Sequence, residues 1–274
     1  MKEFVIVTDT TTDLPREYVE KHHLYMMSLP YTLDDKMRAG SLPTTSQANP
    51  EEAATLYESI LKENDVDILH IAFSSGLSGS FNSCRIAAAD VCEKYPDRRI
   101  VVVDSLAATL GQGLLVYKAV QLKEAGKNLD EIAAWLEENK YHLVHNFTVD
   151  DLFHLHRGGR LSKTAAIVGT MINLKPVLHV DDEGHLVMLS KVRGRKKSLI
   201  GLVDCMEKQL GDWKDKNDII FISHGDCPED AQFVADLIKE RFGYENFMIG
   251  YIGATIGAHS GPGTVALFYM GDHR

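Results

Sequence analysis

Serine and glycine cluster in the stretch Phe73–Ser80, which reads FSSGLSGS and lies between two apolar runs. The run before it, residues 68–72, has the composition of a buried strand, and residues 81–91 have that of a helix. Such a turn exposes hydroxyls and backbone N–H groups together, and the helix N-terminus adds a partial positive charge. The pattern favours binding of a carboxylate or phosphate at the sheet edge where open α/β folds take ligands. An ordinary Ser/Gly turn is the alternative.

A second candidate site is the segment Ile256–Gly263, in which three glycines and a proline surround His259 and Ser260. Glycine and proline in this density predict a rigid loop that holds one imidazole and one hydroxyl at a defined point. Such a histidine can orient a ligand or transfer a proton. A surface hairpin with an incidental histidine is the alternative.

Three further polar segments carry weaker signals. Thr45 and Ser46 could donate to an anion, although extension of the following helix cap is the simpler explanation. Asp9 and Asp13 follow the first predicted strand and could hold Mg²⁺, but Asp13 is more simply a helix cap. The basic residues of 191–197 could dock an acidic partner or a phosphate, and a solvated bend explains them equally well.

The first half of the chain supplies the elements that would position these groups. Short apolar runs at residues 4–8, 23–28, 68–72 and 99–103 predict buried parallel strands. Asn49-Pro50-Glu51-Glu52 and Asn128-Leu129-Asp130-Glu131 have the order of helix caps. Residues 1–146 are therefore predicted to form a three-layer α/β/α domain around a parallel sheet.

The second half, residues 147–274, shows a different order of predicted helices and strands. The segment Phe147-Thr148-Val149-Asp150-Asp151 caps a short helix that Gly158-Gly159 breaks, and residues 160–171 form an apolar helix-like run. Residues 175–180 and 185–191 flank a Gly184 turn, which predicts a hairpin. Further predicted elements are helices at 197–210 and 228–242 and strands at 219–223, 247–252 and 264–270. This half is predicted to be a two-layer α/β domain with a mixed sheet.

Composition excludes several classes of function. The 274 residues favour two domains or one large one, and the net charge of −10 argues against a nucleic-acid footprint. No run approaches the ~20 apolar residues of a membrane span, which leaves only transient contact with a membrane surface. The N-terminus carries no signal-peptide pattern, so we expect a cytoplasmic protein. The free thiols expected there are Cys84, Cys92, Cys205 and Cys227.

Taken in order, the motifs resemble the DegV family. The segments TDTTTDLP, TTSQ, FSSGLSGSFNS, VVDS, FTVDDLFHLHRGGRLS, NLKPVL, KVRGRKK, SHGD and IGAHSGPG run from Val7 to Gly263. The resemblance implies an N-terminal parallel and a C-terminal mixed-sheet domain with a long-chain fatty acid buried between them. It also implies a non-catalytic carrier, since some members are the FakB subunit of bacterial fatty acid kinase. There the FakA subunit phosphorylates the bound carboxyl group with ATP, and the acyl phosphate feeds phospholipid synthesis.

The resemblance also implies site residues. The carboxylate would be held by Thr45, by Ser75 or Ser78, and by His259; spacing does not decide between the serines, and Ser75 is preferred. Docking of a FakA-like kinase would use Arg193 or Arg195, with Arg195 preferred. The acyl pocket could be lined by Ala165, Ala166, Ile167, Val168, Met171 and Ile172, although core packing explains that run too.

Two other functions remain open at this stage. The protein could be a stand-alone hydrolase or phosphotransferase using His259 and Ser75, or a lipid-responsive regulator without a kinase. The sequence contains no G-x-S-x-G elbow, Walker A loop, dinucleotide fingerprint or HExxH motif. We expect no metal and no cofactor beyond the bound fatty acid. Acyl chain length and saturation are not predicted.

Overall fold

The computed structural model describes residues 2–32, 43–161 and 174–274, which divide into two compact units. Unit 1 comprises Met1–Ala108 and Gln112–Lys140, and unit 2 comprises Thr109–Gly111 and Tyr141–Arg274. The boundary therefore falls at residue 140 rather than at 146. The reason is that strand β7 (Leu143–Thr148) pairs within the sheet of unit 2. The predicted apolar helix at 160–171 lies almost wholly outside the described residues.

Unit 1 is built on a four-stranded parallel sheet of order β2-β1-β5-β6. The strands are β1 (Phe4–Asp9), β2 (Tyr25–Met27), β5 (Asp67–Ala72) and β6 (Ile100–Asp104), so all four predicted strands are confirmed. Every residue of β5 is buried, as expected for a central strand with helices on both faces. A small separate hairpin pairs β3 (Tyr31–Thr32) with β4 (Thr44–Thr45).

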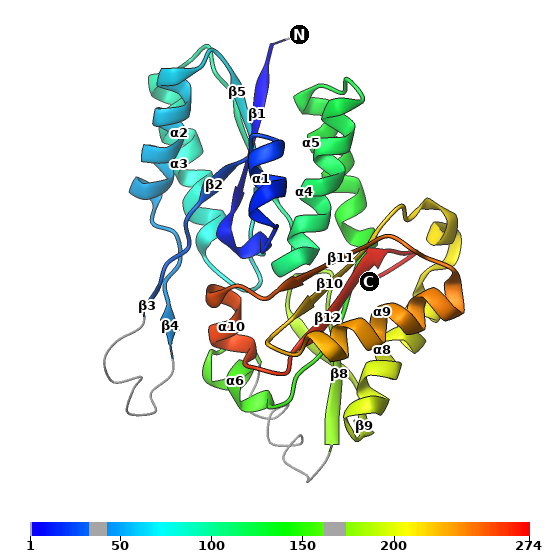
Figure 1. The fold of residues 1–274 in the computed structure, drawn as a ribbon. Helices are drawn as coiled ribbons and strands as arrows, with labels where there is room; N and C mark the ends of the chain where they lie inside the picture. Colours follow the sequence, from blue (N-terminus) through cyan, green and yellow to red (C-terminus); the bar gives the residue numbers. More distant parts are fainter. Residues whose placement is uncertain (1, 33–42, 162–173) are drawn as a thin grey trace. The chain divides into compact units, whose positions relative to one another are not determined.

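Helices cover both faces of this sheet, which confirms the predicted three layers. Helices α2 (Pro50–Glu63) and α3 (Ser80–Lys94) lie on one side, and α4 (Thr109–Glu124) and α5 (Leu129–Asn139) on the other (Figure 1). A short α1 (Arg16–Lys21) follows β1. Complete capping boxes start α2 and α5, as their sequences predict.

Two local expectations in unit 1 need correction. Helix α4 was not predicted, because its apolar residues lie on all sides and give no amphipathic period. Asp13 does not cap the start of α1, which begins after Pro15 without a side-chain cap; with a left-handed φ of 53°, Asp13 instead ends the 3₁₀ turn Thr10–Thr12.

Unit 2 contains a six-stranded mixed sheet of order β11-β10-β12-β7-β8-β9. Its other strands are β8 (Leu174–Val180), β9 (Leu186–Arg193), β10 (Ile220–His224), β11 (Phe247–Tyr251) and β12 (Val265–Met270). Only β10 and β11 pair in parallel among the described strands of this sheet. The predicted hairpin is β8–β9, with Gly184 at a φ of 80° in its turn.

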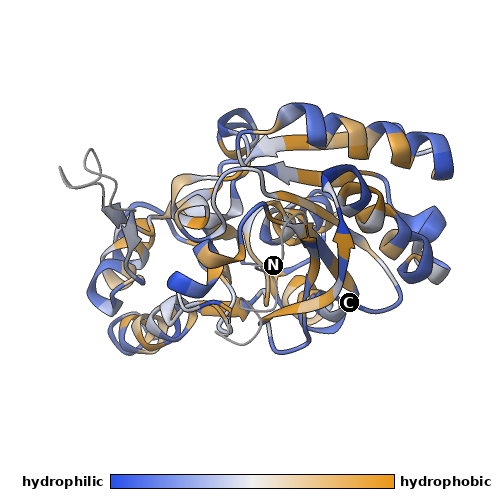
Figure 2. Ribbon diagram, turned by 90° about the horizontal axis from the view of Figure 1, so that it is seen from below, coloured by the Kyte–Doolittle hydropathy of each residue, from blue (hydrophilic) through white to orange (hydrophobic). Residues whose placement is uncertain are grey.

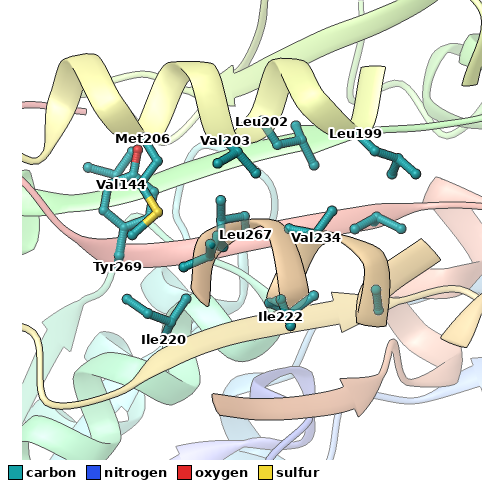
Figure 3. Packing of buried hydrophobic residues seen from close by; sticks show 14 of the residues in the cluster. Val144, Leu199, Leu202, Val203, Met206, Ile220, Ile222, Val234, Leu267 and Tyr269 are labelled. Atoms are coloured by element: carbon teal, nitrogen blue, oxygen red, sulfur yellow. The ribbon is translucent and has the colours of Figure 1, made fainter. Parts of the chain in front are cut away.

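Helices α8 (Arg195–Gln209) and α9 (Pro228–Phe242) pack on one face of this sheet and complete the predicted two layers. Their apolar side chains, among them Leu202, Met206 and Val234, meet Ile222 and Leu267 from the strands (Figure 3). Along the helices hydrophobic and hydrophilic residues alternate, whereas the strands are largely hydrophobic (Figure 2). The remaining turns are α6 (Leu152–Arg157), α10 (Ala254–Ser260) and the 3₁₀ segments Lys140–His142 and Gly211–Lys216.

Within the described ranges, every helix is too short or too polar to cross a bilayer.

A buried polar network ties the carboxyl edge of the unit 1 sheet together. The Oδ1 of Asp9 lies 3.1 Å from His70 Nε2, and Tyr57 Oη lies 2.6 Å from His70 Nδ1. The other carboxylate oxygen of Asp9 accepts from Phe73 N–H and from Gln112 Nε2 at 3.0 Å. All of these side chains are buried, so β1, β5 and α4 are joined by hydrogen bonds that water does not weaken.

The charge state of the network follows from the Asp9 carboxylate. Burial alone lowers the pKa of His70, but the adjacent carboxylate outweighs burial and raises that pKa to about 10. His70 is therefore an imidazolium at neutral pH. Asp9, His70 and Cys84 also place potential metal-ligand atoms within 4.8 Å of one another. Hydrogen bonds already occupy the Asp9 oxygens and both His70 nitrogens, and they explain the positions of these side chains.

The raised pKa of His70 predicts a loss of stability at alkaline pH. Between the unfolded value of about 6.5 and the folded value of about 10, the folded state holds a proton that the unfolded state has released. The stabilisation is thus complete below about pH 6.5 and declines as pH rises toward 10. Urea denaturation from pH 6 to 10 should show the stability difference between wild type and His70→Gln shrinking across this range. A difference that stays constant with pH would contradict the assignment.

Candidate functional site

The serine loop, Ser74–Ser80, leaves the end of β5 and leads directly into α3. The Ser74 amide donates to Ala107 O at 3.1 Å, and its carbonyl accepts from Ser78 N–H at 3.1 Å. The Ser75 amide donates to Asp104 Oδ1 at 3.1 Å. These contacts hold the loop against the end of β6, so its hydroxyls are presented from a fixed backbone.

The TTSQ segment, Thr44–Gln47, lies against this loop within unit 1. The Ala48 amide, just beyond the segment, donates to Ser80 Oγ at 3.0 Å. A Cβ added at Gly79 would lie only 2.2 Å from Gln47 Oε1, so the glutamine amide packs directly on the loop backbone at this glycine. Two motifs that are 32 residues apart are thereby brought together.

The three predicted carboxylate ligands of unit 1 differ in their surroundings. Thr45 is half-buried in β4, where it pairs with Tyr31. Ser75 is exposed, whereas Ser78 is half-buried. Ser78 Oγ lies 2.9 Å from Ser80 Oγ and accepts from Ser80 N–H at 3.2 Å. Ser78 is therefore the serine that the hydrogen bonds connect to the TTSQ segment.

In unit 2, His259 lies in the last turn of α10 and not on a loop. The predicted rigid loop is limited to the residues after Ser260, because α10 continues to that residue and Gly261, with a φ of 75°, ends it. Helix α10 packs against α6, and a Cβ at Gly158 would lie 2.2 Å from His259 Nδ1. The glycine that ends α6 therefore leaves the space that the imidazole fills.

Burial and two arginines set the charge of this imidazole. Burial, then Arg160, then Arg157 lower the pKa of His259 to about 4. At neutral pH the ring is uncharged, with one nitrogen as donor and the other as acceptor. The HRGGR kink thus places positive charge near His259 within unit 2, and such a surrounding favours an anion.

Other predicted motifs converge on the segment that follows α10. Gly263 N–H donates to Gly225 O at 2.7 Å, and Gly225 N–H donates to Thr264 O at 2.8 Å. These bonds join the SHGD and HSGPG motifs. A Cβ at Gly263 would also lie 2.4 Å from Asp150 Oδ2, so the start of the FTVDDLFHLHRGGRLS motif packs against Gly263 as well.

The two arginines predicted to dock a partner have different environments. Arg193 ends β9 and is exposed. Arg195 forms ion pairs with Asp230 at 2.7 Å and with Asp150 at 3.7 Å, and only 22% of its side chain is accessible. Arg195 therefore joins the start of α8 to α9 and to the residues beside Gly263. Lys196 and Lys197 are exposed next to it.

Some predicted site residues cannot be placed, and one was missed. The pocket residues Ala165, Ile167, Val168, Met171 and Ile172 lie outside the described residues. The predicted head-group ligands are divided, with Thr45, Ser75 and Ser78 in unit 1 and His259 in unit 2. Sequence reasoning missed Ser80, whose only signal was a second hydroxyl two positions after Ser78.

Comparison with known proteins defines the family. Residues 3–272 match the family model described as "Uncharacterised protein, DegV family". A DegV domain-containing protein of Clostridium perfringens is 44% identical, over 100% of this chain and 99% of that protein. The chain therefore belongs to the DegV family.

Solved structures of DegV proteins have the same fold. A Thermus thermophilus protein described by its fatty acid binding is 29% identical, with a TM-score of 0.86 over 99% of this chain and 100% of that one. Bacillus subtilis DegV, described as a fatty acid binding protein, is also 29% identical, with a TM-score of 0.84 and the same coverage. The two-domain α/β fold predicted from sequence is thus confirmed.

The lowered pKa of His259 can be tested by titration. We expect the imidazole to stay neutral down to about pH 4, and Arg160→Ala to raise its pKa toward 6.5 by removing a nearby positive charge. Arg157→Ala should raise it less, since Arg157 is the smaller contributor. NMR titration of the His259 ring signal, assigned with His259→Gln, measures the His259 pKa in the wild type and in the two arginine variants. An ordinary pKa near 6.5 in the wild type would contradict the geometry.

Proposed function

We propose that this protein binds a long-chain fatty acid and presents its carboxylate to a kinase partner for acyl-phosphate formation. The observation that carries the proposal is the hydroxyl of Ser78, held beside the TTSQ segment through Ser80 and Ala48. The proposed head-group ligands are Thr45 and Ser78 of unit 1 and His259 of unit 2. The protein itself acts as a carrier and performs no catalysis.

The chemistry of these ligands suits a carboxylate that must later react. Burying a bare carboxylate costs several kcal/mol unless hydrogen bonds satisfy it. Hydroxyls and a neutral imidazole provide such bonds without a direct ion pair, so they accept a carboxylate, a neutral acid or an acyl phosphate. Arg157 and Arg160 add positive charge around His259 and further favour an anion.

The acyl chain would supply most of the affinity. Each buried methylene contributes about 0.8 kcal/mol, so about 14 methylenes offer on the order of 10 kcal/mol. That is enough for tight binding after the cost of association. The proposal assigns the chain contacts to the apolar residues named from the sequence, which are Ala165, Ala166, Ile167, Val168, Met171 and Ile172. The fatty acid binding described for the Thermus thermophilus and Bacillus subtilis proteins supports a lipid ligand here.

For the kinase partner the proposal uses the basic cluster between β9 and α8. Arg193, Lys196 and Lys197 are exposed there on a chain of net charge −10. An acidic surface on a FakA-like kinase would be attracted to such a cluster, and the attraction would weaken as salt rises. We place the protein in the cytoplasm, where such a kinase and its ATP are found.

The hydrolase alternative would use His259 of unit 2 to activate Ser75 of unit 1. The buried histidine of unit 1 beside the serine loop, His70, is already bound by Asp9 and Tyr57. The carrier proposal is preferred because the similar solved structures are described by fatty acid binding, and turnover of test esters by the purified protein alone would favour the hydrolase. A lipid-responsive regulator would bind fatty acid but support no acyl-phosphate formation with any kinase.

The carrier proposal predicts that the purified protein contains non-covalently bound long-chain fatty acid. Organic extraction followed by mass spectrometry should recover it, and the delipidated protein should take up oleate or palmitate. Thr45→Ala and His259→Ala should each weaken binding by roughly 1.5–3 kcal/mol, because each removes a hydrogen bond to a charged group. Neither should unfold the protein, which circular dichroism would verify. Absence of extracted lipid together with absence of uptake would refute the carrier.

Substitutions in the basic cluster can distinguish an effect on kinase docking from an effect on the stability of the fold. Arg193→Ala should leave fatty-acid binding intact, reduce acyl-phosphate formation by a FakA-like kinase, and lessen its salt dependence. Arg195→Ala should reduce phosphorylation too, but should also lower the melting temperature, because Asp230 loses its ion pair with Arg195 and Asp150 keeps, among the described residues, only its pair with Lys175. Arg16→Ala, an exposed arginine of unit 1, is the matched control. Full kinase activity in the Arg193 variant would place docking elsewhere.

A further inference from the structure

The Ser80 hydroxyl is buried at the first turn of α3 and joins two parts of the candidate site. It is fully inaccessible to solvent. Its oxygen accepts the Ala48 N–H at 3.0 Å and lies 2.9 Å from Ser78 Oγ. The Ser80 backbone N–H also donates to Ser78 Oγ, at 3.2 Å. Ser80 thus contacts Ser78 twice and the end of the TTSQ segment once.

Hydroxyl valence determines the direction of the hydrogen bond between the two serines. Each hydroxyl has one proton to donate and two lone pairs that accept. If Ser78 donated to Ser80, both lone pairs of the Ser80 oxygen would accept hydrogen bonds, one from the Ala48 N–H and one from the Ser78 O–H. The hydroxyl proton of Ser80, which is buried, would then have no acceptor among the contacts of the described residues. An unsatisfied buried donor is costly, so Ser80 donates to Ser78.

This direction leaves the Ser78 proton available. Ser78 Oγ then accepts from both the N–H and the O–H of Ser80, which uses its two lone pairs. Its single proton must point to a third partner. Since Ser78 is only half-buried, that partner can be a ligand. A hydroxyl whose two lone pairs already accept hydrogen bonds can interact with a ligand only by donating its proton. Such a hydroxyl therefore favours an anion, which accepts hydrogen bonds.

Ser75 lacks this arrangement. Its amide donates to Asp104 Oδ1 at 3.1 Å, and the same carboxylate oxygen accepts from Leu106 N–H at 3.0 Å. The Ser75 N–H is therefore already used by a carboxylate of the protein and cannot donate to a ligand carboxylate.

We propose that Ser80 is a positioning residue that orients the Ser78 O–H as a donor to the ligand carboxylate, and that Ser78 rather than Ser75 binds that group. The inference rests on the proposed fatty-acid function and specifies how its head group is recognised. The Gln47 amide packs against Gly79, next to the hydrogen bond from Ala48 to Ser80.

The test compares a ligand that has a carboxylate with one that lacks it. Dissociation constants of palmitic acid and hexadecanol are measured for the delipidated wild type, Ser78→Ala, Ser80→Ala and the double variant. Ser78→Ala should weaken palmitic acid about tenfold or more, and Ser80→Ala about fivefold, with hexadecanol within about twofold for both. The double variant should be no weaker than Ser78→Ala, because Ser80 acts through Ser78. Ser80→Thr, which keeps the hydroxyl, should restore binding of the acid.

Ser83→Ala is the matched control, since it removes another buried serine hydroxyl one turn along α3. It should change neither constant. If Ser80→Ala does not fold, Ser80→Cys replaces it with a side chain of similar shape and a much weaker donor. Equal losses for acid and alcohol would show that Ser80 is merely structural and would overturn the inference, as would an acid-specific loss in Ser75→Ala but not in Ser78→Ala. If the wild type bound neither ligand, the proposed function itself would fail.

Discussion

The burial of one carboxylate, that of Asp9, constrains the part of unit 1 from which the candidate site is built. A buried charge is tolerated only when it is paired and hydrogen-bonded. Asp9 meets this requirement with His70 from β5, the Phe73 amide and Gln112 from α4. Because Phe73 directly precedes the serine loop, the bonds that satisfy Asp9 also fix where that loop leaves the sheet. The serine loop that carries Ser78 therefore starts from a backbone fixed by a buried ion pair.

The two candidate clusters each hold a neutral hydrogen-bond donor in a fixed position, but they use different local structures to do so. In unit 1 a hydroxyl supports another hydroxyl, and a glycine allows Gln47 to approach the loop backbone. In unit 2 a helix end carries the imidazole, and Gly158 leaves space for it. Both clusters present neutral donors on backbones that are held by hydrogen bonds. Such preorganised donors can stabilise an anion without reorganising when it binds.

Charge is distributed so that the basic cluster of unit 2 contributes to structure as well as to surface potential. Arg195 pairs with Asp150 and Asp230, and Asp150 in turn pairs with Lys175 at 2.7 Å and packs against Gly263. Its neighbours Arg193, Lys196 and Lys197 are exposed. A substitution of Arg195 therefore acts on the segment beside His259 as well as on the surface. The proposed kinase docking and the proposed head-group site can be tested separately by comparing Arg195 with Arg193.

Much of the fold could be predicted from sequence because it depends on local patterns. The apolar runs became β1, β5 and β6, and the Asn49 and Asn128 boxes started α2 and α5, since caps and buried strands involve neighbouring residues. Helix α4 escaped prediction because burial on all sides removes the amphipathic signal, and α10 is helical although Gly257 within it and the glycines after it favour a loop. The preference that we propose for Ser78 over Ser75 also required the tertiary structure. It rests on the Ala48 amide and the Asp104 carboxylate, which are distant in sequence from these serines and contact the serine loop only when the chain folds.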